Sequence, residues 1–126
     1  MTDFLDSMRN SASGMSAQTM RMRITSENIA NADTPGYRQK TVSFEQTTAT
    51  GGVRALPPEL SERPLERIFA PDHPLADDDG YYDGSSVNLM VEIADARQAQ
   101  RSYEANLRMF DQARSMASSL LDLLRR

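Results

Sequence analysis

Three consecutive aspartates, Asp77–Asp79, are the residues of this chain most suggestive of metal chemistry. An EF-hand calcium loop takes oxygen ligands at alternate positions, needs a glycine for its sharp turn and closes on a glutamate. Counted from Asp77, Asp79 fits the second ligand, but Tyr81 and Tyr82 occupy the places of the third ligand and the glycine. The stretch is more typical of a solvated acidic turn, and we expect no metal ligand in it.

A catalytic centre has equally little support in the sequence. His73 is the only histidine, it lies between Pro71 and Pro74, and the chain has no cysteine that could join it in a metal site. No serine nucleophile motif and no glycine-rich phosphate loop accompanies it. We therefore expect no catalytic residue, no cofactor and no bound metal, and a protein that is not an enzyme.

Composition narrows the class further. The 126 residues are enough for one ordinary domain, but only 6% are aromatic and none is tryptophan, so a thick globular core is not expected. A net charge of -4 argues against a nucleic-acid partner, which normally meets a basic face. The first residues lack the basic and apolar segments of a cleaved secretory signal, and no apolar run reaches the roughly 20 residues of a membrane-spanning helix. We expect neither a cleaved signal peptide nor a membrane span.

A helix is predicted at the start of the chain. In the first thirty residues, larger apolar side chains alternate with smaller ones at spacings of three and four, the seam pattern of a coiled coil. One row is Met8, Met15, Met22 and Ile29, and a smaller, partly polar row is Leu5, Ala12, Thr19 and Ser26. Methionines at this spacing can also line an adaptable binding groove, but a helix core is the commoner meaning. Gly14 lies inside the pattern and costs about 1 kcal/mol relative to alanine, so we expect this helix to need a partner.

The C-terminal segment predicts a longer helix, from about residue 87 to residue 124, with Ser85 or Ser86 as its N-cap. It contains neither glycine nor proline and keeps the same spacing throughout. Its apolar row is Leu89, Ile93, Tyr103, Leu107, Phe110, Leu121 and Leu124. A helix of this length extends roughly 57 Å, whereas a compact chain of this size has a radius of gyration of about 14 Å. Because the N-terminal helix covers only part of it, we expect the two apolar rows to form an assembly seam that also needs a neighbouring subunit.

The middle of the chain has a different pattern. Short alternating stretches at 38–44, 53–56 and 65–69 predict strands, and prolines and Asp-Gly pairs interrupt them. The expected fold is mainly α, with N-terminal and long C-terminal helices packed as a coiled coil and a small irregular β-rich insert between them. We divide it into an N-terminal helix and turn (1–36), a loop-rich insert (37–86) and a C-terminal helix (87–126).

The densest turn signal follows directly on the first helix, in the stretch 31–37. Asn31 and Asp33 tolerate left-handed backbone and suit a helix end. Pro35 pushes the residue before it out of the α region, and Pro35-Gly36 fits the central positions of a type II turn. We expect this turn to end the helix sharply and to send the chain into an extended segment.

The stretch SENIANADTPGYRQKTVSFE resembles the N-terminal signature of the bacterial flagellar rod and hook family of axial proteins. The shared core reads Ala-Asn-x-x-Thr-Pro-Gly-Tyr, and the residues that match it are Ala30, Asn31, Thr34, Pro35, Gly36 and Tyr37. Near the C-terminus, PDHPLADDDGYY and VNLMVEIADARQAQRSYEANLRMFDQARSM are similar to a proximal rod protein of the same family. On these two motifs, in the family's order, the chain is identified as a member.

The resemblance implies a structural subunit of the proximal rod, the periplasmic drive shaft of the bacterial flagellum, which transmits torque through helical self- and co-assembly. It also implies export from the cytoplasm through the flagellar type III apparatus. Its implied partners are the rod proteins FlgB and FlgF, further copies of the chain itself, and the junction protein FliE. Two alternatives stay open: the related proximal rod protein FlgB and, outside the family, a soluble coiled-coil adaptor or export chaperone. An adaptor would be a defined oligomer in solution and would not need the Thr-Pro-Gly-Tyr break.

Overall fold

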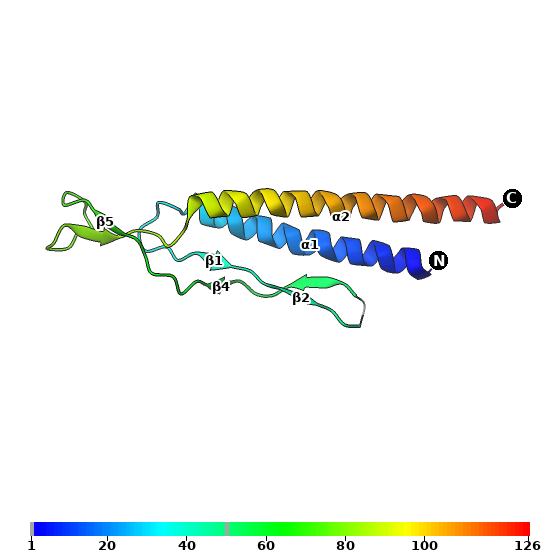
Figure 1. The fold of residues 1–126 in the computed structure, drawn as a ribbon, viewed down its shortest axis with the longest axis horizontal. Helices are drawn as coiled ribbons and strands as arrows, with labels where there is room; N and C mark the ends of the chain where they lie inside the picture. Colours follow the sequence, from blue (N-terminus) through cyan, green and yellow to red (C-terminus); the bar gives the residue numbers. More distant parts are fainter. Residues whose placement is uncertain (1, 50) are drawn as a thin grey trace.

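Two long antiparallel helices make up most of the molecule. The computed structural model describes residues 2–49 and 51–126; Met1, the first residue of the expected N-terminal segment, and Thr50, within the expected insert, lie outside the described residues. The helices α1 (Thr2–Ala30) and α2 (Leu89–Leu124) lie side by side, with both chain ends at the same end of the molecule (Figure 1). This arrangement confirms the mainly α fold with a small β insert. No helix in the described ranges combines the length and apolar character of a membrane span.

The insert forms three antiparallel strand pairs. β1 (Lys40–Thr41) pairs with β4 (Glu59–Leu60), β2 (Phe44–Gln46) with β3 (Val53–Ala55), and β5 (Arg67–Phe69) with β6 (Tyr81–Asp83). The first two pairs follow one another along a hairpin that folds back beside α1 (Figure 1). The third pair extends past the helices, at the end of the molecule away from the termini.

The strands are shorter than the sequence pattern predicts. The expected strand at 38–44 is split into β1 and β2, and the one at 65–69 is reduced to β5. At the split, Ser43 O accepts a hydrogen bond from Leu56 N, but Pro57 and Pro58 follow on the opposite strand. Because proline has no N–H group, the ladder cannot continue there without interruption.

Asn88 is the N-cap of α2. Its backbone is extended (φ -98°, ψ 105°), and its side chain accepts a hydrogen bond from the first turn of the helix. The expectation of Ser85 or Ser86 at this position is wrong, because both serines are buried and bind other segments. Ser86 Oγ accepts a hydrogen bond from Gln39 N at 2.8 Å, and Ser85 Oγ donates to Ala32 O. The two hydroxyl groups therefore join the approach to α2 to the chain that leaves α1.

α1 ends without any left-handed residue, contrary to the expectation for Asn31 and Asp33. Among the described residues, only glycines have a positive φ. Instead the last turn tightens, since Asn31 N donates to both Glu27 O and Asn28 O. The Asn31 side chain also donates to Glu27 O, at 2.8 Å. Glu27 O thus accepts two hydrogen bonds from Asn31, one from the backbone and one from the side-chain amide.

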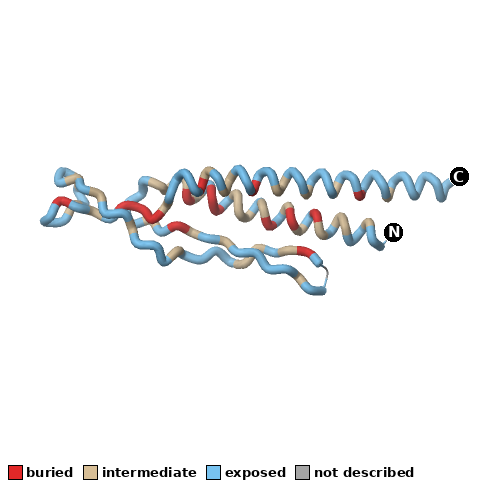
Figure 2. Tube along the Cα trace, in the orientation of Figure 1, coloured by how far each residue is buried: buried red, intermediate tan, exposed pale blue. Residues whose placement is uncertain are grey.

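The faces that the two helices bury against each other carry mostly small and polar side chains. On α1 the buried residues are Ser11, Gly14, Ala17, Ile24, Thr25 and Asn28, and on α2 they are Glu92, Ala99 and Ala113 (Figure 2). A Cβ atom built on Gly14 would lie 2.7 Å from the Asn106 side chain, so the helices approach closely there. On α2 this inner row runs through Glu92, Ala99, Asn106 and Ala113, one position before the apolar row expected from the sequence.

Candidate assembly interface

The apolar residues expected to form the assembly seam do not lie in the buried inner row; we call them the apolar flanks. None of them is buried. The exposed members are Leu5, Leu89, Leu107, Leu121 and Leu124, and the half-buried members are Met8, Met15, Met22, Ile29, Ile93, Tyr103 and Phe110. Within this chain the helices pack through the neighbouring small-residue row, which leaves much of the larger apolar surface open to other molecules.

Polar contacts fix how the two helices lie against each other. Arg21 of α1 donates to Asp95 Oδ1 at 3.3 Å and to Gln98 Oε1 at 3.1 Å on α2. Asn106 donates to a carbonyl of its own helix at 2.9 Å, which holds its side chain beside Gly14. Ion pairs that reach solvent contribute at most about 1 kcal/mol each. These contacts therefore add little to the stability of the helix pair.

A buried polar cluster joins the helices to the insert; we call Asn28, Gln39 and Glu92 the junction cluster. Asn28 and Glu92 are the largest fully buried side chains among the described residues. Asn28 Nδ2 donates to Glu92 Oε2 at 3.2 Å and to Lys40 O at 2.8 Å, while Gln39 Nε2 donates to Glu92 Oε1. Asn28 Oδ1 accepts hydrogen bonds from Lys40 N at 3.0 Å and from the Tyr37 hydroxyl at 2.8 Å. One asparagine thus binds α1, the insert and α2 together.

The residues of the junction cluster carry no apolar periodicity, so the apolar pattern of the sequence does not reveal them. A weaker signal was available in the seven-residue spacing. Gly14 lies two such spacings before Asn28. Ala99 and Ala113 lie one and three such spacings after Glu92. A polar residue in a row of small residues at heptad spacing is typical of a contact that specifies register.

Charges around the junction cluster are paired. Lys40 Nζ lies 2.5 Å from Glu27 Oε1, and this hydrogen bond raises the pKa of Lys40. Burial raises the pKa of the Tyr37 hydroxyl, and the neighbouring Glu27 carboxylate raises it further. Tyr37 therefore remains a neutral hydrogen-bond donor to Asn28 near neutral pH.

The turn formed by the family motif docks on the segment that leads into α2. Gly36 has a φ of 77°, and Tyr37 N donates to Thr34 O at 3.2 Å, as a type II turn around Pro35-Gly36 requires. Gly36 N also donates to two carbonyls at the end of β6, at 3.2 and 3.1 Å. The motif residues are Ala30, Asn31, Thr34, Pro35, Gly36 and Tyr37. Through these bonds the turn holds the end of α1 near the start of α2.

Gly36→Val should lower the free energy of unfolding by about 1–3 kcal/mol, the cost of holding a β-branched residue at positive φ. No atom of the described residues, chain neighbours aside, lies within 4 Å of a Cβ built there, so the penalty arises from the backbone. Urea unfolding of the full chain, followed by circular dichroism, measures it. Gly36→Asn is the matched control and should cost less, because asparagine tolerates left-handed backbone. Equal losses for the two variants would contradict the turn assignment.

The acidic loop is engaged by contacts within its own hairpin. Asp77 Oδ1 accepts hydrogen bonds from two loop amides, and Asp77 Oδ2 lies 2.7 Å from the Arg67 guanidinium. The bond from Tyr81 N, followed by that from Arg67, lowers the pKa of Asp77. His73 stacks on Tyr82, with the ring centroids 3.9 Å apart. In the described part of the chain, no three His, Cys, Asp or Glu side chains are placed to hold a metal ion.

Comparison with protein families matches both ends of the chain to flagellar rod proteins. The family model described as "Flagella basal body rod protein" matches residues 8–38, which hold most of α1 and the motif turn. The model described as "Flagellar basal body rod FlgEFG protein C-terminal" matches residues 78–123, from the approach to β6 almost to the end of α2. The matched parts carry most of the apolar flanks.

Known relatives match almost the whole chain. It is 39% identical over 124 residues to the flagellar basal-body rod protein FlgC of Agrobacterium fabrum, which covers 90% of this chain and 89% of the relative. It is 33% identical over 121 residues to FlgC of Salmonella typhimurium and of Yersinia enterocolitica, covering 88% of this chain and 90% of each relative. These relatives are named as rod proteins and not as enzymes, and they favour FlgC over the alternative FlgB. The chain belongs to the FlgC family of flagellar basal-body rod proteins.

Proposed function

We propose that this chain, a structural subunit of the flagellar basal-body rod and not an enzyme, works in the periplasmic proximal rod and transmits torque through packed helices. As a member of its family it assembles with other rod components. The partners that we propose are FlgB, FlgF, further FlgC copies and the junction protein FliE. In this proposal, segments 1–36 and 87–126 form the helical layer of the rod, and segment 37–86 forms the insert beside it.

The observation that carries the proposal is the open apolar surface of the helix pair. The apolar flanks are exposed or half-buried, whereas small and polar side chains fill much of the contact between α1 and α2. Full burial of one leucine or methionine side chain stabilises by about 1.5–3 kcal/mol. Neighbouring subunits that cover the apolar flanks of both helices would therefore supply much of the free energy that stabilises the rod.

The same surface supports a proposal about export. Among the described residues of α1, only Ala17 and Ile24 are buried apolar residues, so hydrophobic burial within the chain supports the helix weakly. We propose that the helix parts far from the junction cluster become fully ordered only in the rod. A loosely structured subunit suits passage through the flagellar type III export apparatus without a cleaved signal peptide.

Leu107→Asp tests the proposal. Leu107 is 40% exposed, so an aspartate there stays partly solvated in the isolated subunit but would be buried unpaired in the rod. In a strain that lacks its own copy of the gene, we expect export of the variant to continue. Completed rods and swimming should fall to about a tenth of the wild-type level or lower. Electron microscopy of isolated basal bodies counts the rods, and soft-agar swimming reports their function.

Ser115→Asp is the matched control, because it adds the same charge to an exposed position of the same helix outside the apolar flanks. This variant should keep rods and swimming near the wild-type level. Complete rods built from Leu107→Asp subunits would contradict the proposal that the apolar flanks join the subunits.

A further inference from the structure

α2 extends past α1 at the end of the molecule where both termini lie (Figure 1). Every residue from Ser118 to Arg126 is exposed, and we call this segment the α2 end. Its exposed leucines are Leu120, Leu121, Leu123 and Leu124. The α2 end is therefore an apolar stretch of helix that the described residues leave largely uncovered.

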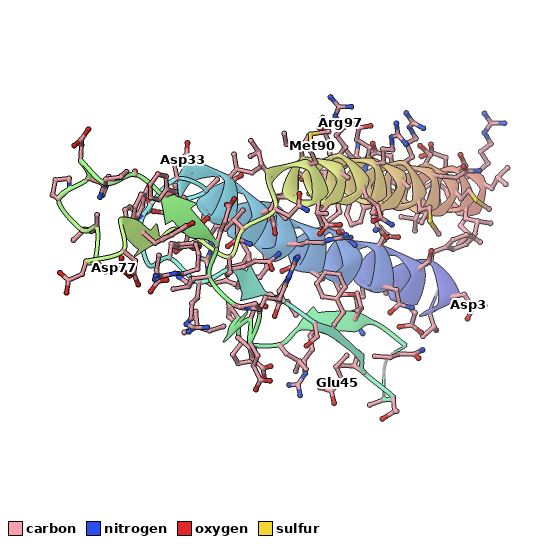
Figure 3. The ribbon with its side chains drawn as sticks, turned by 60° about the vertical axis from the view of Figure 1, so that its left-hand side comes forward. Asp3, Asp33, Glu45, Asp77, Met90 and Arg97 are labelled. Atoms are coloured by element: carbon pink, nitrogen blue, oxygen red, sulfur yellow. The ribbon has the colours of Figure 1, made fainter. Side chains whose placement is uncertain are left out.

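Next to the α2 end, an open groove of about 430 Å³ lies between the start of α1 and α2; we call it the Phe4 groove. Its apolar lining includes Phe4, Met109 and Met116. Both methionines are exposed, and methionine side chains adapt readily to a partner. Asp3 also lines the groove, and Asp6 lines the hollow that adjoins it. Figure 3 shows Asp3 at the free start of α1.

The α2 end cannot enter its own Phe4 groove, because the leucines and both methionines belong to one continuous helix. The occupant must come from another molecule, and the charges indicate which one. Arg125 and Arg126 outnumber Asp122, the one acidic residue of the α2 end, and are opposite in sign to the two aspartates at the groove. Asp6 also lies 3.8 Å from Arg9 of its own helix, in an exposed pair that solvent screens. A second copy of this chain supplies both the apolar side chains and the complementary charge.

We propose that the α2 end of one copy packs into the Phe4 groove of the next copy, with its two arginines against the aspartates at the groove. This contact rests on the proposed function, since it names the surfaces that join successive copies. Each copy uses its groove once and its α2 end once. When these two surfaces meet different neighbours, the contact is heterologous and repeats along an assembly instead of closing into an isologous pair.

Two single-cysteine variants test the contact, because the chain has no cysteine of its own. Leu124→Cys and Met109→Cys are co-expressed, one of them with an affinity tag, in a strain that lacks its own copy of the gene. Oxidised basal bodies should contain a disulfide-linked pair with one chain of each kind. Arg125→Glu with Arg126→Glu in the Leu124→Cys chain should lower the yield about ten-fold. Asp3→Arg with Asp6→Arg in the Met109→Cys chain should then restore it.

Met90→Cys replaces Met109→Cys in the matched control, since Met90 is an exposed methionine at the opposite end of α2 (Figure 3). Equal linkage of Leu124→Cys to either position would overturn the contact, as would a linked product that contains a different rod protein. Swimming under reducing conditions reports the rod function separately. Motile cells whose oxidised rods lack the linked pair would overturn this contact and leave the proposed function standing.

Discussion

Replacing Asn28 with leucine should lower the free energy of unfolding by about 3–5 kcal/mol. The Asn28 side chain is 1% exposed and makes hydrogen bonds to the Lys40 backbone, the Tyr37 hydroxyl and the Glu92 carboxyl group. Leucine has a similar size but makes none of these hydrogen bonds, and the loss of a partner costs about 1–3 kcal/mol for each group that solvent does not reach. Urea unfolding of the full chain, followed by circular dichroism, measures the loss.

Two further variants separate the junction cluster from a general effect of the substitution. Gln100→Leu makes a similar exchange of a side-chain amide for leucine at an exposed position of α2 and should change the stability by no more than about 0.5 kcal/mol. Asn28→Leu combined with Glu92→Leu should lose less than the sum of the two single losses, because the hydrogen bond between the two side chains is lost only once and Glu92 Oε2 is no longer left without its donor. If Asn28→Leu costs no more than Gln100→Leu, the cluster does not hold the helices to the insert.

The helices and the turn were predictable from the sequence because their signals are local. Apolar residues at spacings of three and four indicate a helix, whichever surface the helix packs against. The Pro35-Gly36 pair specifies its turn within four residues. The strand boundaries depend instead on partners far along the chain, such as Leu60 opposite Lys40. Their short stretches carry too little periodicity to show where pairing stops, and the prolines that interrupt the ladder act from the opposite strand.

The inner row of the helix pair was not predictable from apolar periodicity. Apolar spacing pointed to Leu107, but the structure turns the adjacent Asn106 towards α1, where Gly14 leaves room for it. Small residues allow the close approach, yet they contribute almost nothing to an apolar pattern. If the proposed function holds, the strongest apolar pattern in this chain marks contacts with other molecules and not the contact within the chain.

The junction cluster was missed for a related reason. A carboxylate on a helix is usually exposed, whereas the Glu92 side chain is buried. Its hydrogen-bond donors, Asn28 and Gln39, lie 64 and 53 residues away in the sequence. Only the folded chain brings these groups together, so apolar periodicity could not identify Glu92 as buried.

Gly14→Leu should force the helices apart and lower the free energy of unfolding by about 2–3 kcal/mol. Leucine is the better helix former, so a loss of stability must come from packing. A Cβ built on Gly14 lies 2.7 Å from Asn106 Oδ1 and 2.8 Å from its Cγ and Nδ2, so a leucine there must displace the Asn106 side chain. Urea unfolding followed by circular dichroism measures the loss. Swimming should fall as well, because displacing α2 misaligns the apolar flanks on which the proposed assembly depends.

Gly14→Ala tests whether the close approach of α2 is the reason for a glycine at this position. In Gly14→Ala, a gain in helix propensity of about 1 kcal/mol opposes the clash with Asn106. Asn106→Ala removes the clashing amide, so adding Gly14→Ala to that variant should stabilise it by the full gain of about 1 kcal/mol. In the wild-type chain, Gly14→Ala should stabilise by less than this gain or should destabilise. The difference between the two changes in the free energy of unfolding measures the clash between position 14 and Asn106. If Gly14→Ala stabilises both chains equally, Asn106 does not restrict position 14, and the glycine is not explained by the packing of the two helices.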